Sequence, residues 1–165
     1  MSESELLRSS RSRIGPVLER CGFVFPDAAT YVPPDDTSYL NDQDRANPDI
    51  MANVAAMAAT NADIAWLGQY AEGWVGIWRA TGHVVRLDTE GQYEILARDV
   101  GDFLARAALG YGEPWDDALT GLLAAQGFKV SASLEAALAL IADAPDVNGL
   151  RDALYVKLRA KDGAS

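Results

Sequence analysis

The sequence predicts an α+β fold, in which an antiparallel twisted sheet of about four to six strands packs on helices and a helical extension follows. Three observations indicate this fold. Short apolar runs separated by turn residues occupy residues 63–97, and short turns are typical of antiparallel strands because parallel strands need long crossovers. An alanine-rich helical segment precedes these runs, and helical patterns follow them. We expect residues 1–165 to form a single domain, since this length suits one hydrophobic core.

Before the sheet, the chain is predicted to contain an N-terminal helix over 1–22 and an acidic loop over 23–47. The helix carries an apolar stripe that ends at Cys21, which we expect to be a buried and unreactive thiol. Pro16 lacks a backbone N–H, so it either bends this helix or begins a second one. The loop is rich in proline and aspartate and contains one basic residue, Arg45. Loops of this length tend to be functional or mobile.

A helix is predicted over 48–60. Asn47 is a favourable cap, Pro48 suits the first helical position, and Asp49 lies near the positive end of the helix dipole. Its buried face is expected to comprise Ile50, Val54, Met57 and Ala58.

The antiparallel meander over 63–97 is predicted from alternation and from turns. Turn residues occur at 71–73, 80–82 and 88–91. Within the second strand, alternation places Trp74, Gly76 and Trp78 on one face. Val75 and Ile77 lie on the other face. These tryptophans are either core residues or, if their face is open, an interaction surface with a shallow slot beside Gly76.

Residues 99–160 are expected to be helical. The first helix has an apolar face formed by Val100, Phe103, Leu104 and Ala107. A later helix, capped by Ser131 or Ser133, is expected to be buried through Leu134, Leu138 and Ile141. The segment 127–130 is the one place in this half that is compatible with a strand.

Composition restricts the class of partner. The net charge of −10 and the pI near 4.4 count against nucleic acid and against an anionic membrane surface, because binding to either needs a basic face. An acidic surface instead suits a basic protein partner, whose approach it accelerates. The same charge is also typical of a surface that serves only solubility.

The sequence also favours a cytoplasmic location. One cysteine cannot form an internal disulfide, which fits a reducing compartment. The N-terminal residues lack the basic start and apolar core of a signal peptide. Since no apolar run approaches 18 residues, no membrane span is predicted.

No catalytic or metal-binding signature stands out. With one histidine, His83, and one cysteine, a Cys/His zinc site is excluded. No nucleophile elbow, phosphate loop or dinucleotide fingerprint occurs. Asn41, Asp42 and Asp44 offer oxygen ligands, but they lack the spacing of an EF-hand loop. We therefore expect no cofactor, no metal and no enzymatic activity.

Three successive segments carry a family resemblance. Residues 73–79 form a strand with glycine and tryptophan, residues 82–88 read Gly-His-Val-Val-Arg-Leu-Asp, and residues 95–104 lead from a strand into a helix containing Phe-Leu. This succession resembles the SUKH superfamily, which includes yeast cell-wall regulators and many bacterial toxin-immunity proteins. Members of this family share no common enzymatic activity and no cofactor, so the resemblance implies neither for this chain. It implies a cytoplasmic protein that binds and neutralises a co-encoded toxin, often a nuclease with a basic active site.

Our first hypothesis is therefore a SUKH-like immunity or interaction protein that occludes a basic toxin. The expected contact residues are Asp35, Asp36, Tyr39, Asp42 and Asp44, together with Trp74 and Trp78 if their face is open. The alternative is a small-molecule or peptide-binding module, in which the face of Trp74, Gly76 and Trp78 forms the floor of a groove. A third hypothesis, a hydrolase with paired carboxylates, requires a buried carboxylate pair in a cleft.

Overall fold

The centre of the fold is an antiparallel meander of four strands, seen in a computed structural model that describes residues 1–109 and 113–163. The strands lie in the order β1-β2-β3-β4 and comprise β1 Ile64–Tyr70, β2 Gly73–Trp78, β3 Val84–Asp88 and β4 Tyr93–Ala97. The helices of the described residues are α1 Glu3–Ser10, α2 Gly15–Cys21, α3 Asp42–Ala46, α4 Pro48–Ala62, α5 Val100–Ala107, α6 Asp117–Ala125, α7 Leu134–Ala139 and α8 Val147–Gly163. The predicted α+β class is confirmed, with the number of strands at the low end of the predicted range.

The strands are joined by turns where the sequence predicts them. Ala71 and Glu72 have φ angles of 49° and 59°, the left-handed geometry of a tight hairpin turn that matches the twist of the strands. Gly91, with φ of 84°, takes the left-handed position between β3 and β4, where a side chain would be strained.

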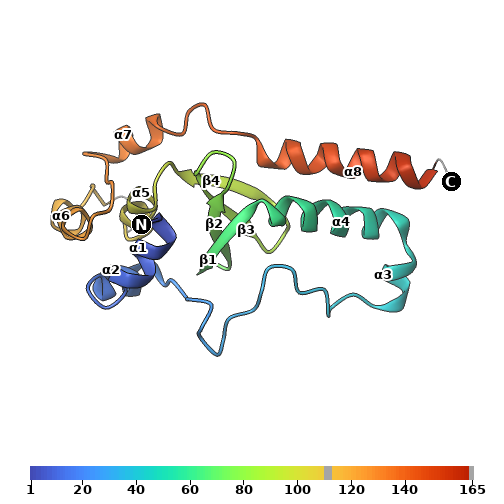
Figure 1. The fold of residues 1–165 in the computed structure, drawn as a ribbon, viewed down its shortest axis with the longest axis horizontal. Helices are drawn as coiled ribbons and strands as arrows, with labels where there is room; N and C mark the ends of the chain where they lie inside the picture. Colours follow the sequence, from blue (N-terminus) through green and yellow to red (C-terminus); the bar gives the residue numbers. More distant parts are fainter. Residues whose placement is uncertain (110–112, 164–165) are drawn as a thin grey trace.

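Helices α1, α2, α5 and α6 cover one face of the sheet (Figure 1). Val75 and Ile77 of β2 face this layer, as the alternation predicts. In α5, Phe103 and Leu104 are at most 1% exposed, and full burial of such a side chain stabilises a fold by about 1.5–3 kcal/mol. The buried Asp102 accepts hydrogen bonds from the Ser131 N–H and hydroxyl, both at 2.6 Å. These bonds hold the segment before α7 against α5.

Helices α4 and α8 lie side by side and cover the other face of the sheet (Figure 1). Trp78 of β2 and Val147 of α8 belong to the apolar cluster beneath them. Near the C-terminal end of α8, the Arg159 guanidinium lies 2.7 Å from the carboxylate of Asp49 in the first turn of α4. The two helices therefore run antiparallel.

In the N-terminal region, predicted as helix over 1–22, Pro16 begins a second helix rather than bending one, which is one of the two expected outcomes. The region forms α1 and α2, and Pro16 lies in the first turn of the second helix, as expected for a residue without an N–H. Gly22 ends α2 in the left-handed conformation, with φ of 66°.

The region predicted as a loop over 23–47 contains more structure than expected. Val24 pairs with Gln69 of β1, and residues 42–46 form the short helix α3. Asn41 and Asp44 each accept a hydrogen bond from the other's backbone N–H, at 2.8 and 3.1 Å, in a capping box.

The buried face of α4 differs from the predicted one. Ala52, Ala56 and Thr60 are at most 4% exposed, whereas Ala58 is exposed and the larger apolar residues of the predicted face are half-buried. The physical reason is that α4 packs mainly on α8, and helix axes approach more closely where the contacting side chains are small.

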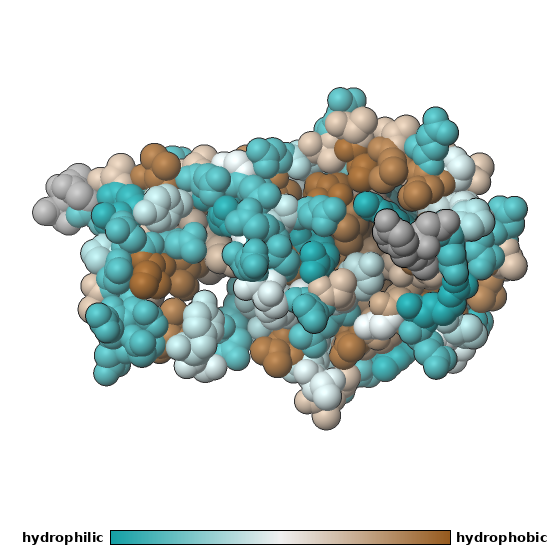
Figure 2. Space-filling model, turned by 180° about the vertical axis from the view of Figure 1, so that it is seen from behind, coloured by the Kyte–Doolittle hydropathy of each residue, from teal (hydrophilic) through white to brown (hydrophobic). Residues whose placement is uncertain are grey.

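The expected burial of α7 is wrong. Ala137 is its buried residue. Of the residues expected to be buried, Leu138 is 40% exposed and Leu134 and Ile141 are half-buried, and the neighbouring Leu140 is 52% exposed. Apolar side chains gather on the surface at this end of the molecule (Figure 2). Residues 127–130 form no strand, although Phe128 is buried in the cluster around α5. None of the described helices has both the length and the apolar character to cross a membrane.

Candidate functional site

A groove separates the acidic loop from the sheet and α4, and we call it the loop groove. It encloses about 330 Å³. Its lining consists of Val32, Pro33, Pro34, Asp36, Tyr39, Met57, Trp74, Leu87, Asp88, Thr89 and Gly91. A smaller adjoining hollow of about 60 Å³ shares Pro34, Asp36, Tyr39 and Met57 with it and extends along α4 to Asn61. The loop groove therefore combines residues from three parts of the chain.

Two hydrogen bonds hold the acidic loop in place beside the sheet. The indole Nε1 of Trp74 donates to the carbonyl of Val32 at 2.7 Å. The side-chain amide of Asn61 donates to Oδ1 of Asp35 at 2.8 Å. Because the two bonds lie at either end of the Val32–Asp35 stretch, they fix the prolines between them against the groove.

Asn61 connects the loop to the protein core. It is 3% exposed, and its Oδ1 accepts a hydrogen bond of 2.6 Å from the hydroxyl of Tyr93 on β4. Burial raises the pKa of Tyr93 above its ordinary value, so its hydroxyl keeps the proton that it donates. A chain of three side chains, Tyr93, Asn61 and Asp35, thus runs from the sheet to the loop.

The charge of the loop groove is negative. Asp36 and Asp88 lie in its wall, and no described residue that lines the groove or the adjoining hollow is basic. Asp36 Oδ1 accepts a bond of 2.9 Å from the Ser38 N–H, which lowers the pKa of this carboxyl. Asp88 Oδ1 accepts bonds from the N–H groups of Glu90 and Gln92, both at 2.9 Å. The bonds described for both carboxylates use Oδ1 alone.

Four of the predicted contact residues come together here: Asp36, Tyr39 and Trp74 line the loop groove, and Asp35 lines the adjoining hollow. Tyr39 is 75% exposed, so its ring is accessible to a partner. Asp42 and Asp44 lie outside the groove lining on α3, where Asp44 also caps the helix. Trp78 belongs to the core beneath α4 and α8, with 6% of its surface exposed.

The shallow slot expected beside Gly76 is absent. A side chain on Gly76 would collide with Ile64 and with the carbonyl of Ala65, because β1 lies against this position. The face of Trp74, Gly76 and Trp78 is therefore no continuous groove floor, and only its Trp74 end contributes to the loop groove. The slot is filled because β1 and the helices pack against this face. Alternation within β2 indicates which residues share a face, but it does not indicate what covers that face.

The turn between β3 and β4 contributes residues that sequence reasoning missed. Asp88, Thr89 and Gly91 line the loop groove together with Pro33 and Pro34, whereas the sequence predicts only a turn at 88–91. Asn61 was also missed, since it lies just beyond the helix predicted over 48–60. The available signal was a polar side chain at the end of an alanine-rich helix. If such an amide is buried, it needs hydrogen-bond partners from elsewhere in the fold.

The residues considered for catalysis show ordinary environments. His83 Nδ1 lies 2.7 Å from the Thr81 hydroxyl, and partial burial together with the nearby Arg98 charge lowers its pKa. Cys21 is 8% exposed, and burial raises the pKa of its thiol to about 12, so the thiol expected to be unreactive is protonated at neutral pH. Within residues 1–109 and 113–163, no group of three or more His, Cys, Asp or Glu side chains could hold a metal ion.

Comparison of the chain with models of known protein families, with curated proteins and with solved structures gave no match.

Proposed function

We propose that this protein is a non-enzymatic protein-binding domain, and that its loop groove binds a basic segment of a partner protein. The observation that carries the proposal is the composition of the groove. Its wall joins the carboxylates of Asp36 and Asp88 to the aromatic rings of Tyr39 and Trp74, without a basic residue among the described lining.

A lysine or arginine side chain has two parts that this groove accommodates. Its aliphatic stem packs against apolar and aromatic surface, as long charged side chains commonly do. Its cationic head is attracted by aromatic faces and forms charge-assisted hydrogen bonds with carboxylates. Tyr39 and Trp74 supply the first kind of contact, and Asp36 and Asp88 supply the second.

The acidic residues outside the groove act at longer range. Asp42 is exposed on α3, which lies just before α4, and the chain as a whole carries a net charge of −10. Such a field accelerates the approach of a basic partner and is weakened by salt. Association should therefore be faster at low ionic strength.

The biological role that best fits such binding is immunity. A SUKH-like protein with an acidic groove would cover the basic active site of a co-encoded toxin and occlude it. Charge complementarity and the resemblance of residues 63–109 support this role, and it remains part of the proposal.

The test is capture of a partner from the lysate of the native host. The tagged protein should retain a basic protein at low salt and release it as salt rises. Asp36→Asn with Asp88→Asn should abolish this capture, because asparagine keeps the Oδ1 acceptor of each residue but removes the negative charge.

The matched control is Glu135→Gln with Asp143→Asn. These two residues are exposed in and after α7, outside the groove lining, and the change removes the same charge. The control variant should capture the partner as the unmodified protein does. Equal capture by the groove variant would contradict the proposed site, and capture that is insensitive to salt would contradict the electrostatic basis.

A further inference from the structure

We infer that a second cavity, between α1 and β1, binds a small amphipathic carboxylate, meaning a carboxylic acid on an apolar body. We call this cavity the α1 cavity. It encloses about 370 Å³ between α1, residues 25–27 and β1. This inference does not rest on the proposed function, because the α1 cavity shares no lining residue with the loop groove.

The inner wall of the α1 cavity is apolar. Leu7, Phe25 and Leu67 line it and are at most 6% exposed, and Pro26 adds to the same wall. The volume corresponds to about a dozen water molecules at ~30 Å³ each, and it lies within the range of roughly 300–1,000 Å³ typical of small-molecule sites. A ring or a short alkyl chain therefore suits the interior.

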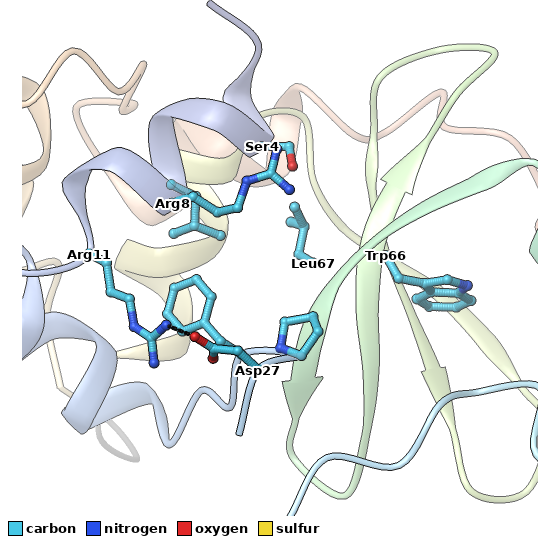
Figure 3. A pocket seen from close by; sticks show the side chains of 9 residues that line it. Ser4, Arg8, Arg11, Asp27, Trp66 and Leu67 are labelled. Carbon is cyan, nitrogen blue, oxygen red and sulfur yellow. Dashed lines mark hydrogen bonds and ion pairs between the residues drawn. The ribbon is translucent and has the colours of Figure 1, made fainter. Parts of the chain in front are cut away.

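The charged residues that line the cavity are Arg8 of α1, Arg11 at the C-cap of this helix, and Asp27. Arg11 is held in place: its guanidinium lies 4.1 Å from the centroid of the Phe25 ring and 2.7 Å from Asp27. Figure 3 shows Arg11 turned toward Asp27 on one side, while Arg8 is turned toward Ser4 and Leu67 on the other. The same view shows the Trp66 ring pointing away from the cavity.

Arg8 is the cation left for a ligand. It forms no ion pair within the described residues, whereas Arg11 is compensated by Asp27. Glu5, the described carboxylate that interacts with Arg8 at longer range, is bound to the Ser2 backbone N–H at 2.7 Å. A guanidinium presents paired N–H donors that match a carboxylate in a bidentate arrangement.

The chemistry of the cavity selects a carboxylate over a phosphate. One uncompensated cation balances the single charge of a carboxylate, while a phosphate carries more charge and more acceptors than Arg8 alone can satisfy. An apolar wall favours a ligand with an apolar body, which inorganic phosphate lacks. The predicted ligand therefore directs its carboxylate to Arg8 and its apolar part toward Leu7, Phe25 and Leu67.

The experiment compares 4-phenylbutyrate with 4-phenylbutyramide, which has a neutral head group and nearly the same shape. Each compound is titrated into the isotope-labelled full chain, and backbone amide shifts are followed by NMR. We expect saturable binding of the carboxylate, with the largest shifts at residues 25–27 and at Leu67. The amide should bind about tenfold more weakly, because it forms no charge-assisted bond.

Two variants test the role of Arg8. Arg8→Gln should reduce the preference for the carboxylate to near unity without unfolding the protein, since Arg8 is exposed. Arg13→Gln removes the same charge at a residue that contacts Gln126 and lies outside the cavity lining, so it should keep the tenfold preference. Absence of saturable binding, equal binding of acid and amide, or an unchanged preference in Arg8→Gln would each overturn the inference.

Discussion

At the residue scale, Asn61 links the acidic loop to the protein interior. Its amide group donates to Asp35 and accepts from Tyr93 while almost fully buried. A buried polar group that loses its partner costs about 1–3 kcal/mol. Together with the bond from Trp74, this buried side chain holds the loop in position, and so it influences the shape of the loop groove from outside the groove lining.

We predict that Asn61→Ala lowers the free energy of unfolding by about 1–3 kcal/mol, because it leaves the buried Tyr93 hydroxyl without its acceptor. Urea denaturation measures this change. The loop should also become more sensitive to limited proteolysis at residues 32–39. Asn53→Ala is the matched control, since Asn53 is exposed on the same helix. Equal stability of the two variants would show that the linkage contributes nothing.

A pH dependence follows from Cys21. Burial raises the pKa of its thiol from 9.0 to about 12, so the unfolded chain loses the thiol proton at a lower pH than the folded protein does. The contribution of the protonated thiol to stability is complete below pH 9 and is lost as the pH rises toward 12. Between pH 8 and pH 10, we predict that the free energy of unfolding of the unmodified protein falls by about 1.4 kcal/mol more than that of Cys21→Ala.

Denaturant titrations of both proteins at several pH values measure that difference. Buried tyrosines also titrate at high pH, but they are present in both proteins and cancel in the comparison. Parallel pH profiles for the two proteins would contradict the prediction.

At the element scale, the ends of helices were predictable because their signals are local. Asn47 and Pro48 predict the start of α4, and the structure shows the Asn47 side chain accepting from the N–H groups of Asp49 and Ile50, at 2.9 and 3.4 Å. The faces of helices were less predictable. In α4 the small residues are buried because α8 lies against them. No local pattern indicates this contact, since α8 begins 85 positions after Ala62.

We predict that Asn47→Ala lowers the free energy of unfolding by about 1 kcal/mol, because two N–H groups of the first turn of α4 lose their acceptor. Thermal and urea denaturation measure the change. Asn47→Ser should restore most of the stability, since a serine hydroxyl caps helices nearly as well. A serine variant as unstable as the alanine variant would assign the loss to something other than capping.

At the scale of the whole molecule, two apolar clusters lie on opposite faces of one sheet, and each candidate site lies against one of them. Leu7, Phe25 and Leu67 of the first cluster line the α1 cavity, and Leu87 of the second lines the loop groove. The sheet and its turns could be predicted from alternation and glycine positions. The loop groove could not, because the bonds of Trp74 to Val32 and of Asn61 to Asp35 join residues 42 and 26 positions apart. The α1 cavity likewise depends on how residues 25–27 return beside α1.

The distribution of charge leads to a kinetic prediction. Asp42→Lys should slow the association of a captured basic partner several-fold at low salt and leave its dissociation nearly unchanged, because Asp42 lies outside the groove lining. Stopped-flow binding measures both rates. Asp143→Lys carries the same change of charge at the α7 end and should have a smaller effect. Equal association rates for the two variants would exclude a steering role for α3.

The pairing of Val24 with Gln69 has a consequence for how the sheet meets other molecules. Val24 and Gln69 exchange two backbone hydrogen bonds of 3.0 and 2.8 Å on the outer side of β1. On the outer side of β4, the Asn148 side chain bonds to both the N–H and the carbonyl of Tyr93, each at 2.8 Å. Unpaired sheet edges recruit strands from other chains and aggregate. Both edges of this sheet are partly closed, so the amides of Gln69 and Tyr93 should exchange hydrogen with solvent as slowly as those of the inner strands.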